Sequence, residues 1–206
     1  MPQSLEELFD PEKHALTGGH YFLLALSSLI IAAGLFFGRL DVVVGGALIM
    51  PILVSAYAVG LGALLGHRGL MRHAYPGIIK SFLAAAAGGA LFGLFSGMNR
   101  ELAFLALDYT FRVAALYALA SFVLSGAAAY AWGRRWIGEV IPGFIAAIAL
   151  VPPLALAGVG VSTLAFGVMR YELISLACNA VGVVVGSFIG FSLVKKKESG
   201  DDERYG

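Results

Sequence analysis

The chain has 206 residues, of which 59% are hydrophobic and 13% charged, and its mean hydropathy is +0.86. Because soluble domains carry about 25% charged residues, this composition excludes an ordinary soluble domain and indicates a membrane protein. The net charge of only +1 argues against a nucleic acid as a partner.

The first 19 residues are polar and mostly acidic, with Lys13 as their single lysine. They lack the positive start of a secretory signal, so we take the following apolar segment as part of the mature protein. Ser4 and Glu7 have the spacing of a capping box, which favours a short helix on the membrane surface within residues 1–19.

Six apolar segments follow, each close to the roughly 20 residues that a helix needs to cross a bilayer. In chain order they are Tyr21–Gly38, Val42–Gly66, Pro76–Gly97, Phe111–Gly133, Gly138–Gly167 and Leu173–Val194. The sequence therefore predicts an all-α polytopic membrane protein.

These segments form two groups of three, residues 20–97 and 111–194. Residues 98–110 are too short and too charged to cross, and we expect them to lie at the interface or to re-enter the membrane. The polar tail over 195–206 is predicted to be disordered.

Lysine and arginine concentrate in the two terminal segments and in the second and fourth loops. With six spans these segments all lie on one side of the membrane. The other side has fewer positive residues, namely Arg39, Arg100, Arg112 and Arg170. The positive-inside rule then places both termini in the cytoplasm, with the chain spanning the cell membrane.

The second member of each group contains proline near its middle. "GGALIMPILVSAYAVGLG" holds Pro51, and "GFIAAIALVPPLALAGVGVS" holds Pro152 and Pro153. Each proline is followed by a Gly-x-Gly. We interpret the match as two repeats of opposite membrane orientation with proline-broken second helices, a plan common among secondary transporters.

The third members match as well, because each carries glycine at every fourth position. These glycines are Gly89, Gly93, Gly97, Gly182, Gly186 and Gly190. Such faces let helices pack closely, either within the chain or between subunits of a homo-oligomer.

Proline also leaves carbonyls without hydrogen-bond donors. Pro152 and Pro153 have no N–H to donate to the carbonyls of Ile148 and Ala149. These carbonyls need partners in a membrane, either neighbouring groups around a simple kink or a bound solute. Asn179 is the strongest polar candidate, because an unpaired amide at mid-membrane is costly. The predicted solute site comprises Pro51, Ser55, Pro152, Pro153, Asn179, Ser27, Ser28, Ser121 and Ser125. The alternative for the serines is bonding to their own helix.

The carboxylates Asp41, Glu139 and Glu172 lie near the ends of the expected spans, where helix capping or anchoring at the interface is the default role. This placement disfavours a carboxylate-bound cation site deep in the membrane. The sequence has no metal-ligand spacing and no catalytic motif, so we expect no metal, no cofactor and no enzymatic activity.

Two stretches, "LALSSLIIAAGLFFGRLDVVVGGALIMPIL" and "GFIAAIALVPPLALAGVGVS", together with Asn179 resemble the prokaryotic membrane proteins of domain-of-unknown-function family 389. The resemblance covers roughly residues 22–194. Family members tend to have a further proline where Val54 and Ser55 stand here. The resemblance implies an architecture, since no activity of the family is known to us.

The sequence thus favours a small transporter or channel for a solute or ion, with its site at the midplane between two broken helices. The alternative is a non-catalytic scaffold that assembles through its glycine faces. In both cases membrane lipid surrounds the chain and a homo-oligomer is expected.

Overall fold

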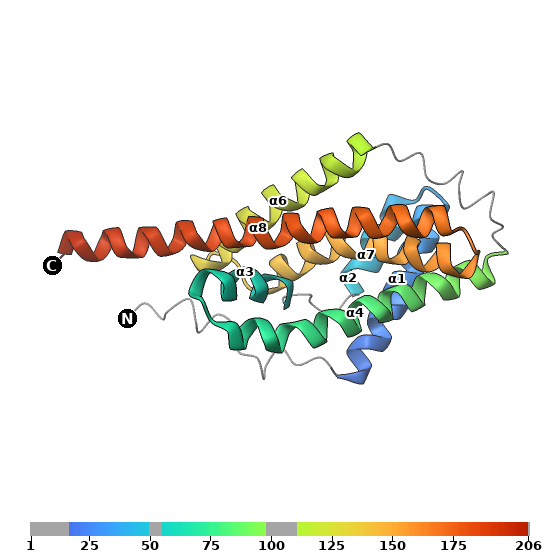
Figure 1. The fold of residues 1–206 in the computed structure, drawn as a ribbon, viewed down its shortest axis with the longest axis horizontal. Coiled ribbons are helices and arrows are strands. Elements are labelled where there is room, and N and C mark those ends of the chain that lie inside the picture. Colours follow the sequence, from blue (N-terminus) through green and yellow to red (C-terminus); the bar gives the residue numbers. More distant parts are fainter. Residues whose placement is uncertain (1–16, 50–54, 98–110, 206) are drawn as a thin grey trace.

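The computed structural model describes residues 17–49, 55–97 and 111–205, and the described part contains helices and no strands (Figure 1). The helices are α1 (Gly18–Phe36), α2 (Leu40–Ile49), α3 (Ser55–Leu65), α4 (Arg68–Phe95), α6 (Phe111–Gly133), α7 (Val140–Ser162) and α8 (Phe166–Tyr205). This confirms an all-α chain. The expectations for residues 1–16 and for the 98–110 connection lie outside the described residues.

Five of these helices, α1, α4, α6, α7 and α8, are long and apolar enough to cross a membrane. Two further apolar helices, α2 and α3, are shorter. A multi-pass membrane protein is therefore supported. The expected second span, Val42–Gly66, corresponds to α2 and α3, and residues 50–54 between them lie outside the described residues.

The connection between α1 and α2 is as tight as the "RLD" link predicts. Gly38 adopts a positive φ of 64°, and the Arg39 N–H donates to the Gly34 carbonyl at 2.8 Å, which closes the end of α1. The Arg39 guanidinium then donates to both carboxylate oxygens of Asp41, at 3.0 and 2.7 Å. A helical hairpin results.

The described helices on either side of Pro51 pack against different neighbours. α2 packs against α1 and α7, whereas α3 packs against α4 and α8. By contrast, α7 runs without interruption through Pro152 and Pro153. The expected break of this helix is therefore wrong, because packing on both sides and a replacement hydrogen bond, described below, hold it together. Pro51 itself lies outside the described residues.

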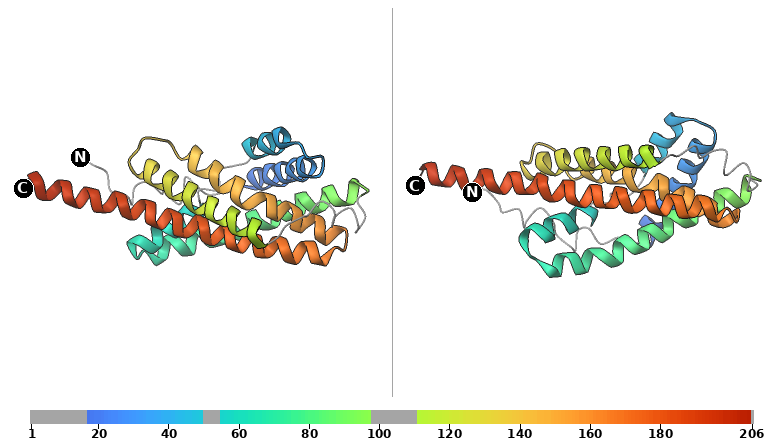
Figure 2. Two further views of the ribbon diagram at one scale, coloured as in Figure 1. Left: turned by 90° about the horizontal axis from the view of Figure 1, so that it is seen from above. Right: turned by 45° about the horizontal axis from the view of Figure 1, so that its top comes forward.

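α7 is the central helix of the bundle. Buried residues make up 61% of its apolar stretch, a larger share than in the other four long helices. It contacts α1, α4, α6 and α8, and it lies between those helices in two further views (Figure 2). Its side chains are therefore best placed to line an internal site.

α8 runs antiparallel to α7 along the whole bundle, and its C-terminal end extends beyond the other helices (Figures 1 and 2). The tail predicted to be disordered instead continues α8 as far as Tyr205. It contains no proline to stop a helix, and lysine, glutamate and arginine are good helix formers.

Candidate solute-binding site

The paired prolines of α7 leave the Ala149 carbonyl without its usual donor, because the donor would be the missing N–H of Pro153. The side-chain amide of Asn179 on α8 donates to this carbonyl oxygen at 2.8 Å. Ala149 and Asn179 lie equally far from the turn between the two antiparallel helices, which explains why they meet. Asn179 thus supplies the hydrogen bond that Pro153 cannot make.

Pro152, Pro153 and Asn179 line one cavity of about 330 Å³, which we call the polar cavity. Helices α1, α2, α6, α7 and α8 all contribute to its wall. Ser121, a fourth predicted residue, reaches it from α6. The remainder of the wall is mainly aliphatic, which is typical of a site that takes a small molecule.

Glu172 also lines the polar cavity, and its role was not predicted. The side chain is only 3% exposed, and its Oε1 atom has no hydrogen-bond partner among the described residues. α8 begins at Phe166 and Glu172 lies in its second turn, so Glu172 does not cap the helix. Its burial does not fit the alternative expectation of an anchor at the interface. A buried carboxylate in an apolar wall is costly, which makes Glu172 a candidate functional residue.

The spacing of the polar residues in the last apolar segment could have identified Glu172 as part of the site. Glu172, Ser175 and Asn179 stand at positions i, i+3 and i+7, which fall on one face of a helix. All three line the polar cavity, and Ser175 is 9% exposed. Polar residues at helical spacing in an apolar segment therefore identify the wall of the site.

Comparison with protein-family models gives a match over residues 47–185 to a domain of unknown function, DUF389. The chain belongs to this family. The matched region includes Glu172, Asn179 and both prolines of α7, so the polar cavity is built largely from the family's shared domain. No curated protein and no solved structure matches the chain.

Ser27 and Ser28 of α1 lie away from the polar cavity and donate to backbone carbonyls of neighbouring helices. Ser27 donates to Gly46 in the last turn of α2 at 2.5 Å, and Ser28 donates to Ala85 of α4 at 2.6 Å. Ser27 thereby joins α1 to α2. These serines join helices rather than line the cavity.

Of the two predicted serines of α6, Ser121 and Ser125, only Ser121 lines the polar cavity. The Ser121 hydroxyl donates to the Tyr117 carbonyl of its own helix at 2.8 Å. Ser125 is fully buried near the Tyr57 hydroxyl and lies outside the cavity wall. Ser55 begins α3, and its side chain, like Pro51, lies outside the described part.

The glycine faces pack helices within the chain. At Gly89 and Gly93 the backbone of α4 lies directly against α7, with no room for a Cβ atom. At Gly182, Gly186 and Gly190, α8 lies equally close to α6. Gly97 follows the end of α4 with a positive φ of 64°, and a Cβ atom at this position would meet nothing within 4 Å.

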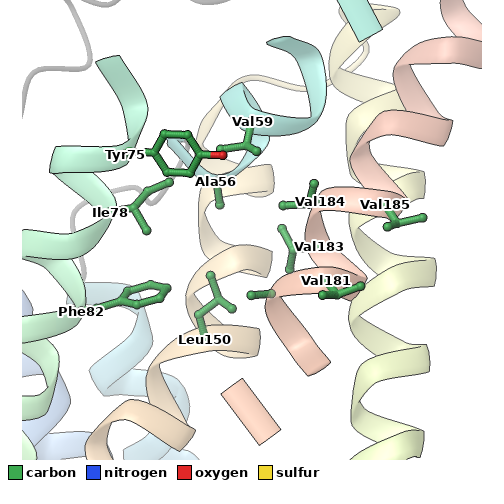
Figure 3. Close-up of a pocket in the computed structure, with 11 residues that line it drawn as sticks. Ala56, Val59, Tyr75, Ile78, Phe82, Leu150, Val181, Val183, Val184 and Val185 are labelled. Atoms are coloured by element: carbon green, nitrogen blue, oxygen red, sulfur yellow. The ribbon is translucent and has the colours of Figure 1, made fainter. Parts of the chain in front are cut away.

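A second cavity of about 340 Å³ lies between α3, α4, α7 and α8, and we call it the apolar cavity. In Figure 3, Tyr75, Ile78 and Phe82 of α4 face Ala56 and Val59 of α3 and the valines of α8. The Tyr75 hydroxyl is the only side-chain polar group among the described residues that line it. This cavity suits apolar groups such as lipid tails.

Proposed function

We propose that the chain is a small membrane transporter or channel and that a small solute or ion binds in the polar cavity. The observation that carries the proposal is the meeting of Glu172, Asn179 and the two prolines at one cavity. Polar groups inside a membrane helix bundle are expensive and mark solute or ion pathways.

The depth of the cavity supports this role. Glu172 lies about 9 Å and Asn179 about 20 Å along α8 from Phe166. The apolar part of α8 runs from Phe166 to Lys196, so Asn179 lies near the middle of the span. The polar groups therefore extend from one side of the membrane towards its midplane.

Helix contacts support the inverted-repeat part of the proposal. In each unit the first helix packs against the third, as α1 against α4 and α6 against α8. The third helix of each unit also packs against the second segment of the other unit, as α4 against α7 and α8 against α3. This correspondence is what two related three-span units would produce if α2 and α3 together match α7. In this proposal the termini face the cytoplasm and the chain assembles as a homo-oligomer in the cell membrane.

The scaffold alternative is less favoured, because the glycine faces on which it depends are used inside the chain. Gly89 and Gly93 pack on α7, and Gly182, Gly186 and Gly190 pack on α6. A scaffold would need to assemble through another surface. We also expect no enzymatic activity, since the proposed role requires only binding and passage.

The test is flux combined with cysteine labelling of the cavity wall. In a Cys178→Ala background, Ser175→Cys places one thiol in the polar cavity, and Ser187→Cys places one at a buried position of α8 outside it. Liposomes containing either variant are screened with radiolabelled cationic, anionic and neutral solutes.

We expect at least one solute to pass faster than through empty liposomes. A small, charged, water-soluble thiol reagent should block that flux for Ser175→Cys and leave Ser187→Cys unaffected. Absence of flux for every solute, or equal insensitivity of both variants to the reagent, would contradict the proposal.

A further inference from the structure

The polar cavity offers hydrogen-bond acceptors to a solute. The Asn179 amide nitrogen already donates to the Ala149 carbonyl, which fixes the orientation of the amide because a carbonyl only accepts. The Oδ1 atom of Asn179 has no partner among the described residues, and neither has Oε1 of Glu172. Both side chains are at least nine-tenths buried.

The α7 wall contains a further backbone carbonyl without its usual donor in the helix. Pro152 has no N–H for the Ile148 carbonyl, and Ile148 is among the residues that line the same cavity. A solute that entered here would find a carboxylate oxygen and an amide oxygen that have no partner among the described residues.

The cavity also lacks positive charge. Among the described lining residues there is no lysine, arginine or histidine, and Glu172 has no ion pair within the described part of the chain. An isolated carboxylate in an apolar environment is unfavourable until a proton or another cation neutralises it. The wall thus selects for positive charge and for N–H donors.

The remaining wall distinguishes between kinds of cation. Divalent ions take six or more oxygen ligands or a cluster of His, Cys and carboxylate groups, and the described residues contain no group of three or more His, Cys, Asp or Glu suited to a metal. Aliphatic side chains such as Leu35, Val43 and Leu156 line most of the space instead. This combination fits a charged head with an apolar body.

We infer that the solute of the polar cavity is a small organic ammonium ion. Its ammonium group donates to the Glu172 carboxylate beside Ser175 and to the Asn179 amide oxygen, and its apolar body lies along the aliphatic wall. This inference rests on the proposed function and adds the class of solute.

The test uses the full chain in lipid nanodiscs and calorimetric titration with n-butylammonium chloride. n-Butanol, sodium butyrate and potassium chloride serve as neutral, anionic and inorganic comparisons of the same concentration range. We expect binding of butylammonium alone. Glu172→Gln should weaken it about 30-fold or more, as removal of one partner of a buried charge pair does.

Two further variants separate binding from folding. Glu139→Gln removes an exposed carboxylate outside the cavity and should bind butylammonium like the unchanged chain. In Glu172→Gln/Ser175→Asp the carboxylate returns one turn away on the same wall, and at least part of the lost affinity should return.

The inference is overturned if Glu172→Gln binds butylammonium as tightly as the unchanged chain, or if potassium binds and butylammonium does not. It is also overturned, with the proposed function intact, if liposomes pass only neutral or anionic solutes and the Ser175→Cys block persists. Failure of flux for all solutes removes the proposed function as well.

Discussion

The two cavities are nearly equal in volume, about 330 and 340 Å³, yet their walls differ in chemistry. Both use α7 and α8. The polar cavity takes Glu172, Ser175 and Asn179 from α8, whereas the apolar cavity takes valines from the next turns of the same helix, Val181 and Val183–Val185. The change occurs within one turn of α8, between Asn179 and Val181.

This difference shows which cavity needs a polar occupant. Lipid tails can fill an apolar cavity in a membrane at no cost in lost hydrogen bonds. A buried carboxylate and an unpaired amide oxygen cannot be satisfied by a tail and call for a cation, a donor or water. Variants that exchange or remove these groups therefore test whether the two cavities differ in function.

The largest effect is expected for Glu172→Lys, which reverses the charge of the polar cavity. Butylammonium binding should fall by about 100-fold or more, because the attraction becomes a repulsion. Glu139→Lys makes the same change at an exposed site, and its affinity should stay within about twofold of the unchanged chain. Calorimetric titration of both variants in nanodiscs checks this, and equal affinities would show that Glu172 does not face the solute.

Asn179→Leu should lower the free energy of unfolding by about 2 kcal/mol, because it leaves the Ala149 carbonyl buried without a donor. Butylammonium affinity should fall as well, by about tenfold, with the loss of the amide oxygen. Unfolding in mixed micelles measures the first effect and titration the second. Cys178→Val, at the neighbouring half-buried position, is the control and should cost less than about 1 kcal/mol.

Pro153→Ala tests whether the Asn179 amide takes the place of the N–H that Pro153 lacks. This change returns a backbone N–H that can donate to the Ala149 carbonyl, so the amide of Asn179 is no longer its only donor. The cost of Asn179→Leu should therefore be smaller by about 1 kcal/mol in the Pro153→Ala background. If the two substitutions change the free energy of unfolding by strictly additive amounts in this double-mutant cycle, the Asn179 amide does not replace the backbone N–H that Pro153 lacks.

Val183→Ala tests the apolar cavity. Val183 is fully buried, and its truncation enlarges a space that has no role in cation binding. We expect a loss of about 1 kcal/mol in the free energy of unfolding and an unchanged butylammonium affinity. A change in affinity as large as that of Asn179→Leu would mean that the two cavities act as one.

Some of this site could be predicted from residues alone. The missing N–H groups of Pro152 and Pro153 follow from covalent chemistry, and so does the need of Ala149 for another donor. Asn179 was predicted to belong to the polar site because an unpaired amide at mid-membrane is costly. The structure adds the bond itself.

Other features depended on tertiary contacts. Whether a proline pair breaks a helix depends on what supports it, and α7 stays continuous between α4, α6 and α8. Glu172 was assigned to a span end because the apolar run starts at Leu173, whereas the helix starts at Phe166. The glycine spacing predicted close packing but could not tell a neighbouring helix from a second subunit.

We propose that the polar cavity, and not its apolar neighbour, holds an organic ammonium ion against Glu172. Crystals of the full chain grown in lipid with 3-bromobenzylammonium test this directly, because bromine gives an anomalous signal. We predict one bromine peak in the polar cavity, with the ammonium group at Glu172, and its disappearance in Glu172→Gln crystals. A peak in the apolar cavity instead, or an unchanged peak in the variant, would contradict the account.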